Sequence, residues 1–474
     1  MRILLTGATG YVGKRLLTVL LKEGHEVYCL VRDKKRFKAA YRGEKDPLLI
    51  EHDLLEDPEK LELPRGIQVV YYLIHSMTSS TKNFESLEEK TARNFLKLTK
   101  KLHPIQVIYL SGIVNEKKLS RHLSSRKNVE DILKQGSFHL TVLRAGIIVG
   151  SGSASFEIIR DLVEKLPVMI TPRWLKTRSK PVAIRDVISF LTGVAGKDFT
   201  YDKVFDIGGP ELLTYKQMLM IYADVRNLKR FILTLPVMTP RLSSYWLYFV
   251  TSVSYPLAVN LVDSMKTDVI PEENKLAEKL NIKPITYRQA IENAFMRIEQ
   301  NMIISSWKDS LVSSMHDRNL NAHIEVPSHG CIKDRKKVKV SNVEKVLNNL
   351  WSLGGEKGWY YANRLWGFRG FLDKLAGGVG LRRGRTHPTE IYHGDALDFW
   401  RVIYASKENK RLLLFAEMKL PGDAWLEFKI DDDNFLHQTA TFRPKGLKGR
   451  LYWAFLFPFH VFVFRGMVKN IARG

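Results

Sequence analysis

A glycine-rich turn close to the start of the chain limits its possible folds more than any other feature. The turn reads TGATGYVG over residues 6–13, and it lies between a short apolar run at residues 2–6 and an amphipathic stretch at residues 12–23. In such a turn the first glycine permits tight bending, the second lets the backbone approach a pyrophosphate, and the third lets a helix pack closely. The free N–H groups at the helix start then face the phosphates. We predict a dinucleotide-binding strand–turn–helix unit with contacts from Gly7, Thr9, Gly10, Tyr11, Val12 and Gly13.

The first 150 residues continue this pattern of apolar runs and amphipathic stretches. Strands are predicted at residues 2–6, 26–31, 48–50, 69–74, 107–110 and 140–143. Near-continuous apolar strands separated by helices indicate a parallel sheet that is covered on both faces. We therefore predict an α/β fold, a doubly wound parallel sheet of Rossmann type, which binds its ligand beyond the carboxyl ends of the strands.

The length of the chain requires more than one domain, because single cores stop growing at roughly 250–300 residues. We assign residues 1–300 to the dinucleotide-binding domain, of which about 151–300 form a small substrate lobe. Residues 301–322 are predicted as a linker and residues 323–474 as a second domain. The basic run at residues 335–339 also has the character of a linker.

The second domain has the pattern of an antiparallel meander followed by a helix. Strands are predicted at residues 399–405, 412–418, 425–430 and 435–442, with short polar turns between them and a helix over residues 448–472. Leu426, Phe428 and Ile430 alternate with charged residues, which indicates a sheet with one buried face. We predict an α+β domain of helix-grip type. Its many aromatic residues form either a core or an apolar ligand cavity.

Two apolar stretches raise the question of a membrane. Residues 242–262 carry no charge, but their serines, asparagine and proline favour buried helices over a span. Residues 451–464 number fewer than the roughly 20 needed to cross a bilayer. We predict that this second stretch is the buried helix of the second domain. The alternative is an interfacial helix that rests on a membrane beside Arg443, Lys445, Lys448 and Arg450.

The ends of the second and third predicted strands carry the residues that select the cofactor. Arg32 offers a planar positive group to a 2′-phosphate, and Asp33 can reach a ribose hydroxyl. Asp53, with Leu54 beside it, is placed near the adenine, where its carboxylate accepts a hydrogen bond from the amine or caps a helix. We expect NADP in preference to NAD.

These residues together resemble the short-chain dehydrogenase/reductase superfamily, in its extended and atypical, NmrA-like branch. The resemblance covers about residues 1–300 and rests on the turn, Arg32, Asp33, Asp53, Asn94 and the segments 109–112 and 144–150. From about residue 320 the chain resembles the domain family of unknown function DUF2867, in segments 358–361 and 394–401 among others. The second resemblance implies no activity.

The first resemblance implies a site in which serine, tyrosine and lysine move a proton while hydride is transferred. Ser111 matches the serine, and Asn94 matches an asparagine that shapes the site. His122 and Arg126 stand where the tyrosine and the lysine would be. Histidine titrates near neutral pH and can act as acid or base, whereas arginine stays charged. His75 and Ser76, after the fourth strand, are expected to face the cofactor or to cap a helix.

Charge and cysteine usage limit the partners and the compartment. The 74 Lys+Arg and 50 Asp+Glu residues give a net charge of +24, which favours acidic partners such as an anionic membrane. No nucleic-acid-binding motif accompanies this charge, so we expect no nucleic-acid partner. The chain has two cysteines and its first residues have the pattern of a strand and not of a signal peptide. These features predict a cytoplasmic protein, with membrane association as the alternative.

Two functions follow from these features. The first is an NADP-dependent oxidoreductase that acts on a small apolar substrate, a carbonyl or a quinone. The second is a non-catalytic dinucleotide-binding sensor or scaffold whose second domain binds a lipid or a partner. The second function stays open because the chain lacks the tyrosine and the lysine of the superfamily's catalytic site. Substrate turnover distinguishes the two, because both predict cofactor binding.

Overall fold

A computed structural model gives the fold of the chain as two compact units, Met1–Met315 and His316–Gly474. It describes residues 1–34, 37–38, 41, 45–74, 84–114, 121–235, 259, 262, 267–299, 331–355, 357–375, 378, 380, 390–392, 395–444 and 446–473. The predicted linker, residues 301–322, lies outside the described residues. The domain boundaries therefore stay a prediction, and each unit is described by itself.

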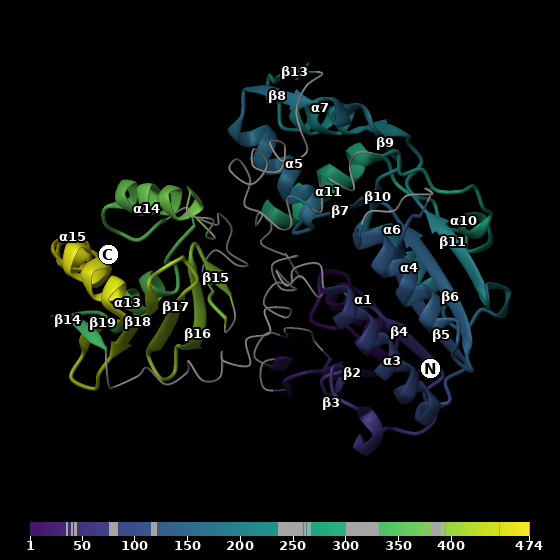
Figure 1. Cartoon of the computed structure of the whole chain (residues 1–474), viewed down its shortest axis with the longest axis horizontal. Coiled ribbons are helices and arrows are strands. Elements are labelled where there is room, and N and C mark those ends of the chain that lie inside the picture. Colours follow the sequence, from purple (N-terminus) through teal and green to yellow (C-terminus); the bar gives the residue numbers. More distant parts are fainter. Residues whose placement is uncertain are drawn as a thin grey trace. The chain divides into compact units, whose positions relative to one another are not determined.

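The first unit is built on a parallel sheet (Figure 1). Its described strands are β1 (Arg2–Thr6), β2 (Glu26–Val31), β3 (Leu48–Glu51), β4 (Val69–Tyr72), β5 (Gln106–Gly112), β6 (His139–Ala145) and β11 (Lys203–Ile207). They lie in the order β11-β6-β5-β4-β1-β2-β3, and every neighbouring pair is parallel. The strand order reverses between β1 and β4, which is where sheets of this kind bind dinucleotides. The predicted doubly wound sheet is confirmed.

The edge strand β11 was not among the predicted strands. It comes from the predicted substrate lobe, yet it pairs with β6 from Lys203↔Thr141 to Ile207↔Ala145. An edge strand is buried less than its neighbours, and Lys203 and Val204 are exposed here. Its sequence therefore lacks the continuous apolar run that marks a central strand.

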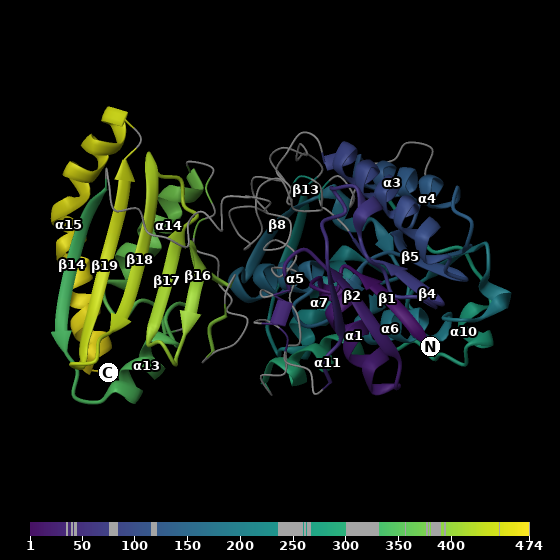
Figure 2. The same cartoon turned by 90° about the horizontal axis from the view of Figure 1, so that it is seen from below.

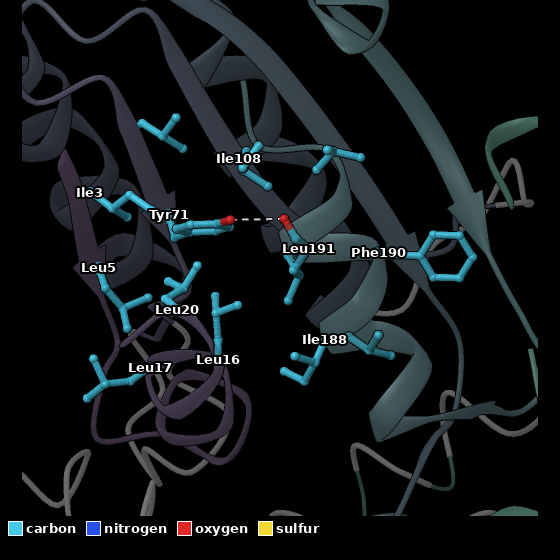
Figure 3. Packing of buried hydrophobic residues seen from close by; sticks show 14 of the residues in the cluster. Ile3, Leu5, Leu16, Leu17, Leu20, Tyr71, Ile108, Ile188, Phe190 and Leu191 are labelled. Atoms are coloured by element: carbon cyan, nitrogen blue, oxygen red, sulfur yellow. Dashed lines mark hydrogen bonds between the residues drawn. The ribbon is translucent and has the colours of Figure 1, made fainter. Parts of the chain in front are cut away.

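Helices cover both faces of the sheet because consecutive strand residues point to opposite sides. Tyr71 of β4 faces α1 (Tyr11–Lys22) and α6 (Ile184–Gly193), and its hydroxyl donates to the carbonyl oxygen of Leu191 at 2.9 Å (Figure 3). Tyr72, the next residue, packs with the core on the other face, beneath α3 (Phe84–Leu102) and α4 (Arg121–Leu133). The result is a three-layer arrangement with two separate cores.

The predicted substrate lobe contains short strands and helices. They are β7 (Ile148–Val149), α5 (Ala154–Lys165), β8 (Val168–Pro172), β9 (Arg178–Ser179), β10 (Val182–Ala183), β12 (Leu213–Thr214), α7 (Tyr215–Val225), β13 (Phe231–Leu235), α10 (Leu276–Lys279) and α11 (Tyr287–Glu299). Phe156, Tyr222 and Ile291 join α5, α7 and α11 in one core. Of the uncharged stretch 242–262, all but Val259 and Val262 lies outside the described residues.

The second unit holds an antiparallel sheet of order β14-β19-β18-β17-β16-β15 (Figure 2). Its strands are β14 (Ile332–Lys339), β15 (Ala396–Leu397), β16 (Trp400–Ser406), β17 (Arg411–Ala416), β18 (Gly422–Ile430) and β19 (Phe435–Pro444). Its helices are α13 (Val343–Leu350), α14 (Asn363–Leu375) and α15 (Gly446–Arg473). The predicted meander and final helix are confirmed.

The basic run at residues 335–339 is not a linker but most of strand β14. This strand pairs with β19 from Ile332↔Phe442 to Lys339↔Phe435. It lies at the edge of the sheet, where charged side chains protect the open side from further pairing. A strand of this kind has the composition of a surface segment, which explains the wrong interpretation.

The aromatic residues of the second unit divide between a core and a surface. Trp359, Phe399 and Phe464 are buried in the core beneath the helices. The prediction that residues 451–464 form a buried helix is wrong for much of the stretch. The helix is present as part of α15, but it exposes Phe455, Phe459 and other residues of the stretch. One helix of the described residues, Gly449–Arg473 within α15, is long and apolar enough to cross a membrane.

Candidate functional site

The glycine-rich turn joins β1 to α1 at the point where the strand order reverses. Gly7 has a φ of +71°, and a Cβ there would lie 2.5 Å from the carbonyl oxygen of Leu73, just after β4. A Cβ on Gly13 would lie 2.1 Å from the carbonyl oxygen of Gly7. Neither backbone atom can move out of the way as a flexible side chain would. The first and third glycines are therefore required by the packing of the turn itself.

The start of α1 is open to an anion. Gly10 is the N-cap residue, no side chain caps the helix, and no acidic residue stands in the first turn. The first N–H groups of a helix lack partners within the helix, and its dipole favours negative charge there. The backbone N–H of Gly10 itself donates to the carbonyl oxygen of Gly7 at 2.9 Å, which tightens the turn. These residues fit a pyrophosphate.

Tyr11 fastens the turn to a second loop. Its side chain is buried, which raises the pKa of its hydroxyl, and that hydroxyl lies 2.8 Å from the position of a Cβ on Gly150. The guanidinium of Arg15 lies 4.2 Å from the centre of the Tyr11 ring and donates to the carbonyl oxygen of Ser151 at 2.8 Å. Arg15 was not predicted as a site residue, although a basic residue four positions after Tyr11 shares its helix face.

At the end of β2, Arg32 is exposed and Asp33 is half-buried. Partial desolvation lowers the pKa of Arg32, and the carboxylate of Asp53 acts against that effect. Asp53 Oδ1 also accepts the backbone N–H of Leu55 at 3.0 Å within a turn. The next helix begins at Pro58 and is capped by Asp57, so Asp53 is not a helix cap. The side chain of Leu54 is buried in the core.

Asn94 holds the turn that follows β3 and carries Asp53. Its Nδ2 donates to the carbonyl oxygens of Leu54 at 2.8 Å and of Glu56 at 3.0 Å. Both of its N–H groups are therefore used on the turn that follows β3. We interpret Asn94 as a positioning residue for the segment that carries Asp53.

Three buried polar atoms lie near the ends of β5 and β6. Ser111 is almost fully buried, and its side chain interacts with the hydroxyl of Tyr109, which lowers the pKa of that tyrosine against the effect of burial. Arg126 lies over the end of β5, since a Cβ on Gly112 would be 3.7 Å from its Cδ, and its Nε lacks a described partner. The same holds for the Ser179 hydroxyl, which lies 3.4 Å from the position of a Cβ on Gly146, after β6. Unpaired buried groups of this kind call for a water or a ligand.

Helix α4, which carries Arg126, is held by a hydrogen bond to α3 and by an ion pair to β6. Ser125 donates its hydroxyl to the carboxylate of Glu88 on α3. Glu130 is fully buried and contacts Arg144 on β6 at 2.9 Å, as well as Lys127 and Lys134. These contacts fix the position of the Arg126 backbone next to the sheet.

Tyr109 does not replace the missing tyrosine. Its hydroxyl donates to the carbonyl oxygen of Arg126 at 3.3 Å, and burial raises its pKa to about 12. A tyrosine with such a pKa keeps its proton at neutral pH and is a poor acid–base catalyst. His122 lies in α4, but its side chain is outside the described residues, as are His75 and Ser76.

Family models match both parts of the chain. Residues 3–113 match the NAD dependent epimerase/dehydratase family. Residues 331–467 match the protein family of unknown function DUF2867. The chain therefore has a segment similar to the NAD dependent epimerase/dehydratase family, followed by a segment similar to DUF2867. Both predicted resemblances are thereby confirmed.

The curated relatives match only part of this chain. Photosystem II assembly factor Ycf39 of Cyanophora paradoxa is 28% identical over 193 residues, which are 40% of this chain and 56% of that protein. Divinyl chlorophyllide a 8-vinyl-reductase of Arabidopsis thaliana is 23% identical over 227 residues, 44% of this chain and 53% of that protein. The chain thus spans about half the length of these relatives.

A solved structure agrees with the fold of the epimerase/dehydratase-type domain. It is a nucleoside-diphosphate-sugar epimerase from Staphylococcus aureus, with a TM-score of 0.50 and 15% identity over 62% of this chain and 100% of that chain. The first unit therefore has a fold of the Rossmann and short-chain dehydrogenase/reductase type. Ser179, like Arg15, is a residue that sequence reasoning missed. It lies in the two-residue strand β9, and no pattern in the neighbouring sequence indicates that this strand approaches Gly146 at the end of β6.

Proposed function

We propose that this protein is an NADP-dependent oxidoreductase that reduces an apolar carbonyl or quinone-type substrate. The observation that carries the proposal is that Ser111, Arg126 and Ser179 each place a buried polar atom near the end of β5 or β6. These residues lie near the carboxyl ends of β5 and β6. The nucleotide-binding turn lies at the switch point of the same sheet, between β1 and β4. A relative that is by name a reductase supports reduction over epimerisation.

NADPH, when bound, supplies the hydride. The turn and the start of α1 hold its pyrophosphate, Arg32 holds its 2′-phosphate, and Asp33 and Asp53 contact its adenosine half. Ser111 donates a hydrogen bond to the substrate oxygen from its buried hydroxyl. The permanent charge of Arg126 stabilises the negative charge that develops on that oxygen. His122 is the titratable group that the chain offers as proton donor.

A dinucleotide-binding sensor without turnover is the second candidate. It is favoured by one specific observation, the state of Tyr109, whose hydroxyl is bonded to Arg126 and keeps its proton. The site would then bind a nucleotide but lack the tyrosine that donates a proton to the substrate in short-chain reductases. In either case we place the protein in the cytoplasm, where its two free cysteines stay reduced.

The test is a fluorescence titration of the whole protein with NADPH, followed by absorbance assays with a panel of carbonyls and quinones. We expect Ser111→Ala to bind NADPH normally and to lose about 100-fold in turnover, as is typical when a group that stabilises the transition state is removed. Ser124→Ala, at an exposed position of the same helix as Arg126, is the matched control and should keep full turnover.

Each result selects one interpretation. Oxidation of NADPH that depends on substrate and on Ser111 supports the reductase. Tight binding with no oxidation across the panel rejects the reductase in favour of the sensor. Failure to bind either NADPH or NADH contradicts both.

A further inference from the structure

The last helix of the chain exposes an apolar stripe. Leu451, Phe455, Phe459 and Phe462 recur at spacings of three and four residues, so they share one face of α15. Their exposed fractions are 62%, 75%, 59% and 60%. Helix residues on the opposite side, such as Met467 and Ile471, are fully buried in the core. The stripe is therefore a surface feature and not the core side of the helix.

A second helix of the same unit presents the same kind of face. Helix α14 exposes five large apolar side chains: Leu365, Phe368, Phe371, Leu372 and Leu375. The two helices contact each other where the rings of Trp366 and Phe464 lie 5.8 Å apart. Large exposed apolar patches on a folded unit mark sites of protein or membrane contact.

The exposed charged residues of these two helices are basic. Helix α15 contains no acidic residue, and its exposed stripe continues into Arg465 and Lys469. The single acidic residue of α14, Asp373, is buried and accepts the backbone N–H groups of Lys419 and Gly380. Apolar aromatic faces flanked by basic groups fit the interface of an anionic bilayer.

We propose that the exposed faces of α14 and α15 form a docking surface for a membrane that contains anionic lipids. Leu451, Phe455, Phe459 and Phe462 enter the interface, while Arg450, Arg465 and Lys469 contact lipid phosphates. A spanning helix is disfavoured because Phe464, Met467 and Val468 are buried in the core of the unit. Insertion across the bilayer would require that core to open.

The experiment is sedimentation of the whole protein with vesicles. Vesicles of phosphatidylcholine alone are compared with vesicles in which roughly one third of the lipid is phosphatidylglycerol. We expect binding to the anionic vesicles, and a loss of at least about tenfold in affinity in the variant Phe455→Ser/Phe459→Ser, since two large apolar groups no longer leave water. Phe231→Ser is the matched control, because Phe231 is 63% exposed in the other unit.

Further variants separate this proposal from its alternatives. Arg465→Gln/Lys469→Gln should weaken binding to anionic vesicles, and Phe368→Ser/Phe371→Ser tests the second helix if the first double variant does not fold by circular dichroism. Equal binding to neutral vesicles, or unchanged binding in both phenylalanine variants, overturns the proposal. Retention of the protein on vesicles after an alkaline carbonate wash overturns it in favour of a span. Concentration-dependent dimers that the phenylalanine variants abolish, without vesicle binding, overturn it in favour of a second copy of the chain.

Discussion

At the residue scale, the choice of cofactor depends on one side chain at the end of β2. We predict that Arg32→Gln lowers the affinity for NADPH by about 10- to 100-fold, because a charge-assisted hydrogen bond to the 2′-phosphate is lost. The affinity for NADH should stay the same, since NADH has no phosphate at that position. Fluorescence titration with both nucleotides measures the effect.

The control for this prediction is Arg65→Gln, which removes an equal charge from another exposed position. If both variants lose NADPH affinity equally, net charge and not a specific contact is responsible. If Arg32→Gln binds NADPH as the natural protein does, the preference for NADP is wrong.

The sequence predicts some site residues better than others for a physical reason. Gly7 and Gly13 are marked by their spacing, because the backbone clash that each avoids arises within a few residues of the chain. The role of Asn94 depends on carbonyl groups that precede it by about 40 residues. Ser179 approaches Gly146 only through the folding of the predicted lobe. Such contacts have no local signal.

At the scale of elements, helix α4 is fixed to the sheet by a buried carboxylate. Although burial opposes it, contacts with Lys134 and Arg144 hold the pKa of Glu130 below its ordinary value. A carboxyl whose pKa is lowered on folding stabilises the protein at neutral pH. That stability is lost as the pH falls below the unfolded value of 4.5 and through the folded value. Acid should therefore loosen α4.

We predict that Glu130→Gln lowers the free energy of unfolding by about 3 kcal/mol at pH 7, since the remaining charges lose their buried partner. The difference from the natural protein should shrink below pH 4.5, where Glu130 itself becomes protonated. Urea unfolding at several pH values measures this. Glu89→Gln, which removes an exposed pair with Arg93, should change stability by less than about 1 kcal/mol at every pH. A constant difference across the pH range would contradict the assignment.

Elements with long apolar runs are predicted well, whereas the edge strands β11 and β14 are not. The central strands β1 and β4 are buried on both faces, so their sequences are mostly apolar, with Ile3, Leu4 and Leu5 in β1 and every residue of β4 buried. Strands β11 and β14 lie at edges of their sheets, and their sequences carry the charged residues that edges require. Helix α15 was predicted with nearly correct ends, but its apolar composition does not tell which face is covered.

At the scale of the whole molecule, the two predicted domains correspond to separate cores. No hydrophobic cluster of the described residues contains members from both units. Composition and length could predict this division, since one core of 474 residues is implausible. Composition and length do not predict whether the two domains contact each other, because such contact depends on the surface residues of each domain.

Separate cores should unfold separately, and a nucleotide should stabilise only one of them. We predict two transitions in calorimetry of the whole protein. NADPH at about 100 times its dissociation constant adds about 2.7 kcal/mol to the unit that binds it. That corresponds to a rise of roughly 5–10 °C in the midpoint of one transition. The other transition, that of the DUF2867 domain, should not move.

The control is Gly13→Ala, whose added Cβ would lie 2.1 Å from the carbonyl oxygen of Gly7 and distort the turn. It should abolish the shift produced by NADPH while leaving the transition of the DUF2867 domain in place. Gly367→Ala, at a position of α14 where a Cβ meets nothing within 4 Å, should keep the shift. A single transition that moves as a whole with NADPH would mean that the two units unfold as one body. The nucleotide would then stabilise both units together, and separate cores would not make separate folding units.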